Sequence, residues 1–297
     1  MMKLLSLMAL MAYSGIGVAQ NKKLDSLRSV LDDNPGGASA QVLWGIAYEL
    51  FDVDNAEALE YAGKAYKKVW DTNDSLVIVK VGTTYGQLLR RMDRVEESIK
   101  VSSLLLPISR RHDFRKYTKM LLNSLALAFT YTNEFDKALE HNLESLDLRK
   151  REGDRKEIAI ALQNIGLLYY RLGDPQLSLQ FSIEAREAIR AANITDYLGE
   201  CILSSNMGFC FTDLNQFEVA MEHFNSALQK ASSKMDLTSM TTAEYGIGKL
   251  LIKQLKWEDA KPHLNRSIRF AIDSKNATFQ ILSMILLSDA ADRKSVV

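Results

Sequence analysis

Apolar residues recur at three- and four-residue spacing along almost the whole chain, and no segment shows a sustained alternation of β-branched residues. This spacing places apolar side chains on one face of an α-helix. Only four prolines and fifteen glycines interrupt the pattern over 297 residues. The sequence therefore predicts an all-α protein.

A second, longer pattern is superimposed on the first. It consists of a small residue, an aromatic residue or leucine three positions later, a turn, another aromatic residue and then alanines. The clearest copy is Met207, Gly208, Phe211, Asn215, Phe217, Ala220, Phe224 and Ala227. The small residues that open five copies are 40, 40, 42 and 40 residues apart: Gly86, Ala126, Gly166, Gly208 and Gly248. A fixed period of this length predicts a repeat protein.

Each copy is predicted to form two antiparallel helices joined by a short turn. A small residue on the first helix lets the second helix approach closely, and the aromatic side chains fill the remaining space. Turn-prone residues lie where the chain reverses, for example Asn133, Gly173 and Asn215. Because one pair buries only part of its apolar surface, neighbouring pairs must stack.

This register divides the chain into segments. We expect a capping helix and turn over residues 20–37 and six repeats over residues 38–276. Residues 277–297 are predicted to form a truncated seventh repeat or a C-terminal cap helix. The six repeats are expected at about 38–75, 76–117, 118–157, 158–199, 200–239 and 240–276.

Residues 1–19 have the pattern of a cleavable signal peptide. Lys3 supplies a positive charge, an apolar stretch follows, and Gly17 and Ala19 are small residues at the cleavage site. The alternative is an uncleaved membrane anchor, but the stretch is shorter than the ~20 residues that span a bilayer. We therefore expect an exported protein, periplasmic or secreted, with a mature chain that begins at Gln20.

Charge and chemistry-bearing residues narrow the function further. The 37 basic residues balance the 37 acidic ones, so no overall field favours nucleic acid. Cys201 and Cys210 lie on one predicted helix and cannot bridge each other. The segment from Gly246 to Lys249 lacks the full spacing of a phosphate-binding loop. The four histidines are far apart in the sequence. We expect no catalytic residue, no cofactor and no metal site, and hence no enzyme.

The copies resemble the tetratricopeptide repeat family over about residues 38–290. They depart from it in their period of about 40, longer than the usual 34, and in Pro262, which falls inside a second helix and is expected to kink it. The longer period is similar to that of extended repeats in bacterial regulators. The resemblance implies a tetratricopeptide-like α-α superhelix, a solenoid of antiparallel helix pairs, whose first helices line a concave groove.

Applied to this sequence, the register predicts which side chains face the groove. They are amides, aromatic residues and cations: Gln87, Arg90, Asn123, Tyr131, Asn164, Tyr170, Arg171, Asn206 and Lys249. The wider set of first-helix positions adds Thr83, Leu127, Ser205, Phe209, Asp213 and Tyr245.

Asn164 and Asn206 occupy the same position of two successive copies. Amide side chains both donate and accept hydrogen bonds, so the two could pair with a peptide backbone, and the resemblance implies this role. The alternative is that they bridge neighbouring helices.

Two functions agree with these features. The first is an exported, non-catalytic module that binds a protein or peptide in the concave groove. The second is the extracytoplasmic sensor region of a membrane-bound signal-transduction protein, whose output part, a histidine kinase or a DNA-binding regulator, is not in this chain. No segment after the first 19 residues is long and apolar enough to span a membrane.

Overall fold

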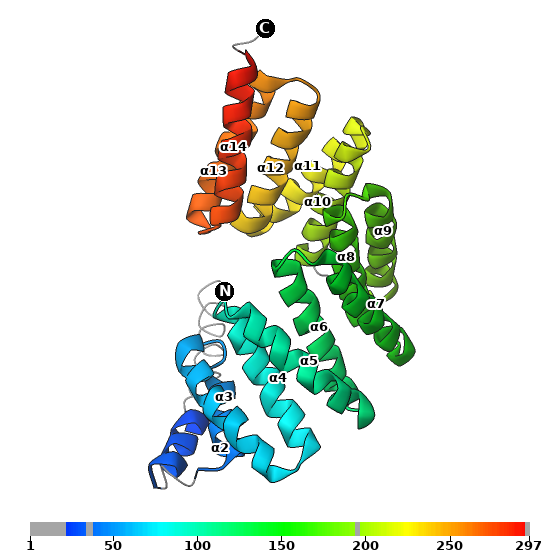
Figure 1. The fold of residues 1–297 in the computed structure, drawn as a ribbon. Helices are drawn as coiled ribbons and strands as arrows, with labels where there is room; N and C mark the ends of the chain where they lie inside the picture. The colour runs from blue at the N-terminus through cyan, green and yellow to red at the C-terminus, as the bar shows by residue number, and fades with distance from the viewer. Residues whose placement is uncertain (1–21, 34–37, 194–196, 295–297) are drawn as a thin grey trace, which may run out of the picture. The chain divides into compact units, whose positions relative to one another are not determined.

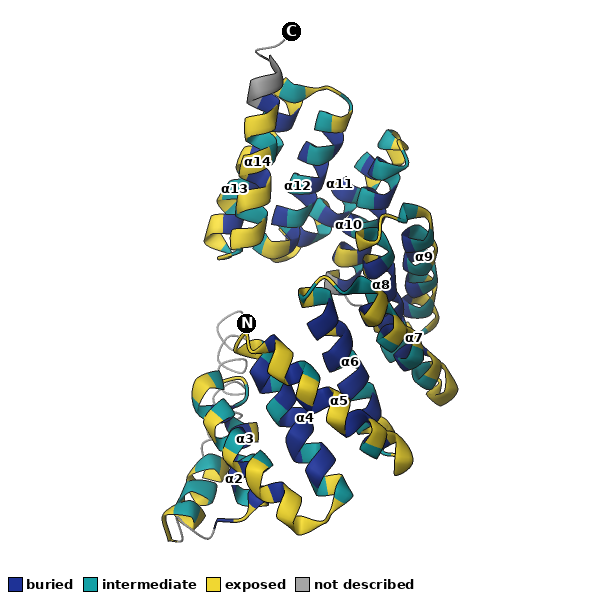
Figure 2. Ribbon diagram, viewed as in Figure 1, coloured by how far each residue is buried: buried dark blue, intermediate teal, exposed yellow. Residues whose placement is uncertain are grey.

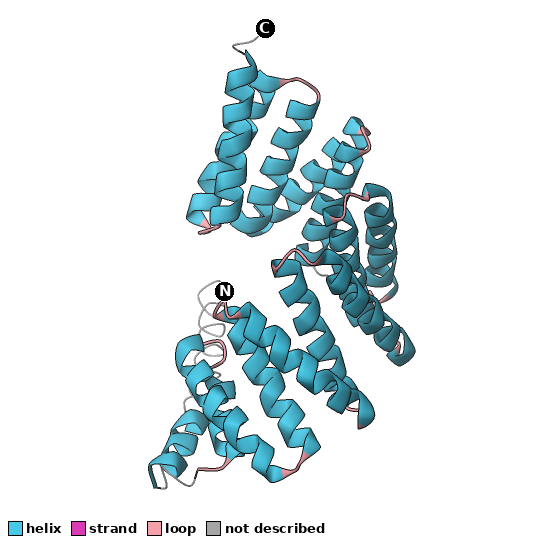
Figure 3. Cartoon of the chain, viewed as in Figure 1, coloured by secondary structure: helices cyan, strands magenta, loops and turns pink. Residues whose placement is uncertain are grey.

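The computed structural model describes residues 22–33, 38–193 and 197–294. Within these ranges the chain consists of helices joined by short turns, without a strand (Figure 3). The predicted all-α fold of antiparallel helix pairs is therefore confirmed. The predicted signal peptide, residues 1–19, lies outside the described residues and stays a prediction.

The chain divides into two compact units, Met1–Leu148 and Arg149–Val297. In the first unit residues 22–33 are helical. The helices that follow are α2 (Ala40–Leu50), α3 (Asn55–Val69), the 3-10 turn η1 (Trp70–Thr72), α4 (Ser75–Arg91), α5 (Val95–Arg111), α6 (Arg115–Tyr131) and α7 (Phe135–Glu152), which runs into the second unit.

Successive helices of the first unit pack against one another from α2 to α6 (Figure 1). Its core includes Ile46 and Leu50 of α2, Ala58 and Ala62 of α3, and Leu88 of α4. The two alanines are fully buried, which brings α2 and α3 close together.

The second unit contains the longer series of helices. They are α8 (Arg155–Arg171), α9 (Pro175–Ala191), α10 (Tyr197–Asp213), α11 (Phe217–Lys234), α12 (Leu237–Lys253), α13 (Trp257–Asp273) and α14 (Ala277–Lys294). The pairs are α8 with α9, α10 with α11, and α12 with α13, and α14 packs on α12 and α13. The first helices also contact one another, since α10 touches both α8 and α12.

The close approach within pairs depends on small residues, as the repeat pattern predicts. A β-carbon at Gly208 would lie 2.7 Å from Cε1 of Phe224, and one at Gly248 would lie 2.5 Å from Cδ2 of Leu264. Both side chains are fully buried. Burial follows one face of each helix in this unit (Figure 2).

Most turns between helices contain one residue in the left-handed conformation. Asn133, Gly173 and Asn215 have φ values of 60°, 83° and 61°, as expected for turn-prone residues. Met235 and Leu255 take the same conformation, with φ of 52° and 62°. The turn is therefore imposed by the helix packing even where the side chain does not favour it.

Three further predictions concern single features. Helix α13 continues as one helix across Pro262. Cys201 and Cys210 are both free and buried, so no disulfide links them, as predicted. None of the described helices combines the length and apolar character needed to cross a bilayer.

Candidate functional site

A pocket of about 400 Å³ lies on the first helices of the second unit. We call it the groove pocket. Its lining comes from α8, α10, α12 and α14, together with Ser178 at the start of α9. The lining residues are Leu167, Tyr170, Arg171, Ser178, Asn206, Phe209, Thr242, Tyr245, Lys249, Phe279 and Leu282.

Aromatic rings form one continuous row in this pocket. The ring centres of Tyr170 and Phe209 are 6.1 Å apart, and those of Phe209 and Tyr245 are 6.0 Å apart. Phe279 continues the row at 5.3 Å from Tyr245. Four helices therefore each contribute one ring, and these rings suit an apolar or aromatic side chain of a ligand.

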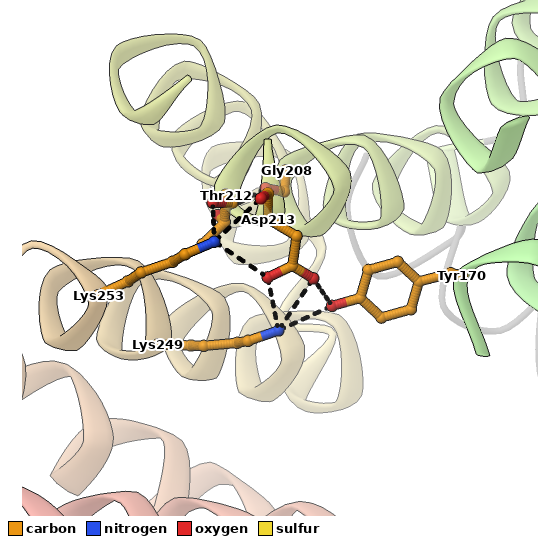
Figure 4. A network of polar contacts seen from close by, with 6 residues as sticks. All are labelled: Tyr170, Gly208, Thr212, Asp213, Lys249 and Lys253. Carbon is orange, nitrogen blue, oxygen red and sulfur yellow. Dashed lines mark hydrogen bonds and ion pairs between the residues drawn. The ribbon is translucent and has the colours of Figure 1, made fainter. Parts of the chain in front are cut away.

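A polar network borders the row at the C-terminal end of α10 (Figure 4). The Tyr170 hydroxyl donates to Oδ2 of Asp213 at 2.6 Å. Lys249 Nζ donates to the Tyr170 hydroxyl oxygen at 2.8 Å and lies 3.4 Å from Oδ1 of Asp213. These bonds tie α8, α10 and α12 together across 79 residues of sequence.

Lys253 completes the network. Its Nζ donates to the backbone carbonyls of Thr212 and Asp213 at 2.9 and 3.0 Å. These carbonyls end α10, where a cation is favoured by the helix dipole. The same Nζ is 3.7 Å from Oδ1 of Asp213.

The network leaves a positive charge in the pocket, because two ammonium groups share one carboxylate. Lys249 also lies 5.5 and 5.7 Å from the ring centres of Tyr170 and Phe209, within cation–π range. Burial, and then the hydrogen bond to Asp213, raise the pKa of Tyr170 far above its ordinary value. Tyr170 is thus a permanent hydrogen-bond donor to Asp213.

Two amides in this unit are not used by the fold. Asn164 on α8 and Asn206 on α10 are both half-buried. Within the described ranges, neither side-chain amide has a hydrogen-bond partner. Because the described chain shows no bridge from either amide to a neighbouring helix, both remain available to a ligand.

The structure brings together several of the predicted groove residues. Tyr170, Arg171, Asn206 and Lys249 line the groove pocket. Asn164 lies on α8, six residues before Tyr170, outside the lining. Phe209 and Tyr245 of the wider set line the pocket, and Asp213 joins the polar network.

Two members of the wider set face the core instead. Thr83 and Ser205 are each only 2% exposed. The Thr83 hydroxyl donates to the Val79 carbonyl of its own helix at 2.7 Å, so it is occupied within α4. The expectation that these two side chains face the groove was wrong, because both lie on the side of the helix that packs against its neighbours.

The other predicted residues belong to the first unit. Gln87 and Arg90 on α4 and Asn123 on α6 are half-buried. Tyr131 is exposed, and its hydroxyl donates to Asp93. Burial, and then the neighbouring Arg91, lower the pKa of Arg90. These side chains are not part of the groove pocket.

Some lining residues were not predicted from the sequence. Leu167 could have been found, because it lies 40 residues after Leu127 and 42 before Phe209. Phe279 and Leu282 carry no such signal, since α14 was expected only to end the stack. Within the described part of the chain, no three His, Cys, Asp or Glu residues are grouped as a metal site would require.

Comparison with known proteins supports the fold. Residues 157–233 match the tetratricopeptide repeat model. No curated protein sequence matches the chain.

Solved structures are similar at low identity. A signal-transduction ATPase with a tetratricopeptide repeat sensor, from Pyrococcus horikoshii, has a TM-score of 0.71 and 16% identity over 98% of this chain and 44% of its own. The apo quorum sensor NprR from B. thuringiensis has 0.65 and 15% over 93% and 81%. A Rap protein complexed with Competence and Sporulation Factor has 0.58 and 14% over 90% and 80%. At these identities the similarity establishes the fold alone.

Proposed function

Because the chain folds as antiparallel helix pairs of the tetratricopeptide type, we propose that the groove pocket binds an extended peptide segment of a partner protein, without catalysis. One observation carries this proposal: two half-buried amides without partners in the described chain lie on the helices that supply the aromatic row. A half-buried amide that gains hydrogen bonds from a ligand is stabilised by it.

The chemistry of the pocket defines the peptide. Asn164 and Asn206 would donate to and accept from its backbone, which requires no particular side chain. One apolar or aromatic side chain of the peptide would enter the row of rings. Arg171 and Lys249 would favour an acidic residue next to that side chain.

Similar structures agree with ligand binding by this fold. One of them is a Rap protein in complex with Competence and Sporulation Factor, and another is a quorum sensor. Neither protein indicates which peptide this chain would bind.

The test is a double variant, Asn164→Ala with Asn206→Ala. A peptide selected from a random displayed library on the wild-type protein serves as the probe, and fluorescence anisotropy gives its Kd. Each lost hydrogen bond is worth about 0.5–1.5 kcal/mol, so we expect Kd to rise by roughly 5- to 100-fold.

The matched control is Asn265→Ala, which removes an exposed amide from the second helix α13. It should leave Kd unchanged, and circular dichroism should show the same helix content in all variants. An unchanged Kd in the double variant, with the library peptide still bound, would show that these amides do not hold the ligand.

We further propose that the protein is exported, and that its binding role is that of an interaction module or, alternatively, of the sensor region of a membrane-bound signalling protein. The support is the pattern of residues 1–19. Mass spectrometry of the protein from its native envelope fraction should find an N-terminus at Gln20. Intact Met1 in that material would contradict export by cleavage.

A further inference from the structure

A second pocket of about 330 Å³ lies where α9, α10 and α11 meet. It shares no lining residue with the groove pocket, and we call it the outer pocket. Leu203 and Met207 of α10 form its apolar floor, and both are almost completely buried. An ion pair between Lys230 and Glu200 also borders the pocket.

The next helix pair shows what occupies the equivalent position there. Gly208 and Gly248 are 40 residues apart, so Ser204 corresponds to Glu244, and His223 corresponds to His263. Glu244 is 3% exposed. Its carboxylate lies 2.7 Å from Nδ1 of His263 and accepts a hydrogen bond from Nε of Arg266 at 2.6 Å.

The preceding pair fills the same position with apolar groups. Counting back 42 residues, Leu162 corresponds to Ser204, and Phe181 corresponds to His223. Leu162 is 3% exposed. The position therefore carries a leucine beside a phenylalanine in one pair and a glutamate beside a histidine in another. Ser204 is too short to fill it, and the outer pocket is the space that results.

The charges around the pocket are unbalanced. Arg186 and Arg190 lie one turn apart on α9, and neither has an ion-pair partner among the described residues. Like charges at this spacing destabilise a helix slightly. Burial, and then the charge of Arg186, lower the pKa of His223. Glu222, also in the lining, is exposed.

From this arrangement we propose that the outer pocket binds a carboxylate ligand of about the length of a glutamate side chain. Its carboxylate would lie against His223 and Arg186, as the carboxylate of Glu244 lies against His263 and Arg266 in the next pair. Its methylene groups would lie on the apolar floor. Arginine is suited to this role because its planar donors match a carboxylate.

Propionate is the first probe, because it has the atoms of a glutamate side chain. Its neutral amide, propionamide, is the matched control. We expect propionate to raise the Tm of the protein and to shift the NMR signals of the His223 ring, and propionamide to do neither. Equal responses to the two compounds would overturn the proposal, because charge recognition would be absent.

A substitution supplies the same carboxylate from within the chain. Ser204→Glu places it where Glu244 lies in the next pair, and Ser204→Gln has the same size without the charge. We expect Ser204→Glu to melt about 2–4 °C above Ser204→Gln and to lose the response to propionate. A lower Tm for Ser204→Glu than for Ser204→Gln, or a retained response, would overturn the proposal.

The positive wall is tested separately. Arg186→Gln should abolish the response to propionate, whereas Arg269→Gln, at an exposed position of α13, should leave it intact. The double variant of Asn164 and Asn206 should also respond as the wild type does, which separates this site from the groove pocket. A full response in Arg186→Gln would contradict the assigned contact.

The carboxylate could come from a free organic acid or from a glutamate side chain of a partner protein. Glutarate and N-acetylglutamate amide distinguish the two sources. Tighter binding of glutarate identifies a free diacid, and tighter binding of the blocked glutamate identifies a protein side chain. If neither compound changes the Tm or the His223 signals, the proposal is wrong for both sources.

Discussion

A β-carbon at Gly246 would lie 2.2 Å from Cε1 of Phe224, so this ring rests directly on the backbone of the next pair's first helix. The same ring atom would lie 2.7 Å from a β-carbon at Gly208 of its own pair. Phe224 is therefore wedged between α10 and α12 and has no free space on either side.

Gly246→Ala is expected to destabilise the protein. The added methyl group would have to displace a fully buried ring or the helix itself, and overpacking of this kind costs about 1–3 kcal/mol. Urea unfolding measures the change in the free energy of unfolding.

Gly63→Ala is the matched control for this substitution. A β-carbon there would lie 3.5 Å from its nearest neighbour, Tyr85, an ordinary contact. Alanine is favoured over glycine within a helix by up to about 1 kcal/mol, so this variant should be as stable as the wild type or more stable. Equal effects of the two substitutions would contradict the wedge.

The buried carboxylate of Glu244 predicts a dependence of stability on pH. Burial opposes its ionisation, but hydrogen bonds from His263 and Arg266 outweigh burial and lower its pKa. The folded protein thus keeps Glu244 ionised at a pH where the unfolded chain would protonate it. This stabilisation is present above the ordinary glutamate pKa of about 4.3 and is lost as the pH falls through the lower pKa of the folded state.

Glu244→Gln should therefore reduce the free energy of unfolding by about 1–3 kcal/mol at neutral pH, because it weakens two buried hydrogen bonds. The difference from the wild type should shrink as the pH falls below about 4. Urea unfolding over a pH series measures it. A difference that stays constant down to acid pH would contradict the ionised pairing.

Asp213→Asn is expected to change the charge of the groove pocket. It keeps an oxygen that can accept from Tyr170 but removes the negative charge near Lys249 and Lys253. The ion pairs are partly exposed, so we expect a loss of only about 0–1 kcal/mol in the free energy of unfolding.

Removal of this charge should also make acidic peptides bind more tightly, with a steeper dependence on salt. Anisotropy titrations at two salt concentrations measure both effects. Asp259→Asn, an exposed residue of α13, makes the same change in net charge away from the pocket and serves as the control. The same gain in affinity in both variants would show that only net charge matters.

Leu255→Asn is expected to stabilise the protein. Leu255 has φ of 62° and is 68% exposed, so it pays for a left-handed backbone without burying its side chain. Asparagine tolerates this conformation better, by about 0.5–1 kcal/mol. Leu172→Asn is the control, because Leu172 is also exposed but has φ of −75°. The midpoint of thermal unfolding should rise only in the first variant.

Much of the fold and part of the site could be predicted from the period of the sequence. A fixed spacing of small residues determines which helix faces pack together, and so it also indicates which faces remain outside. Tyr170, Asn206 and Lys249 were found in this way. Thr83 and Ser205 were placed wrongly because they lie at the boundary between the two faces, where one residue of offset decides the side.

Contacts between distant side chains were beyond this reasoning. The hydrogen bond between Tyr170 and Asp213 depends on how far α8 and α10 are offset, which the period does not specify. The left-handed Leu255 was not foreseen because leucine has no preference for turns. The outer pocket was missed for another reason. The difference between Ser204 and Glu244 is visible in the sequence, but it has meaning only once the neighbouring histidines are seen to be equivalent.

Helix α10 contributes to both pockets of the second unit. Asn206 and Phe209 reach the groove pocket, while Ser204 and Met207 reach the outer pocket. A ligand in either place would fix the same rigid element, so the two occupancies are allosterically linked through it. Any factor by which a carboxylate changes the affinity for a peptide must equal the factor by which the peptide changes the affinity for the carboxylate. One helix would then let a small metabolite or a second protein set the threshold at which the groove responds.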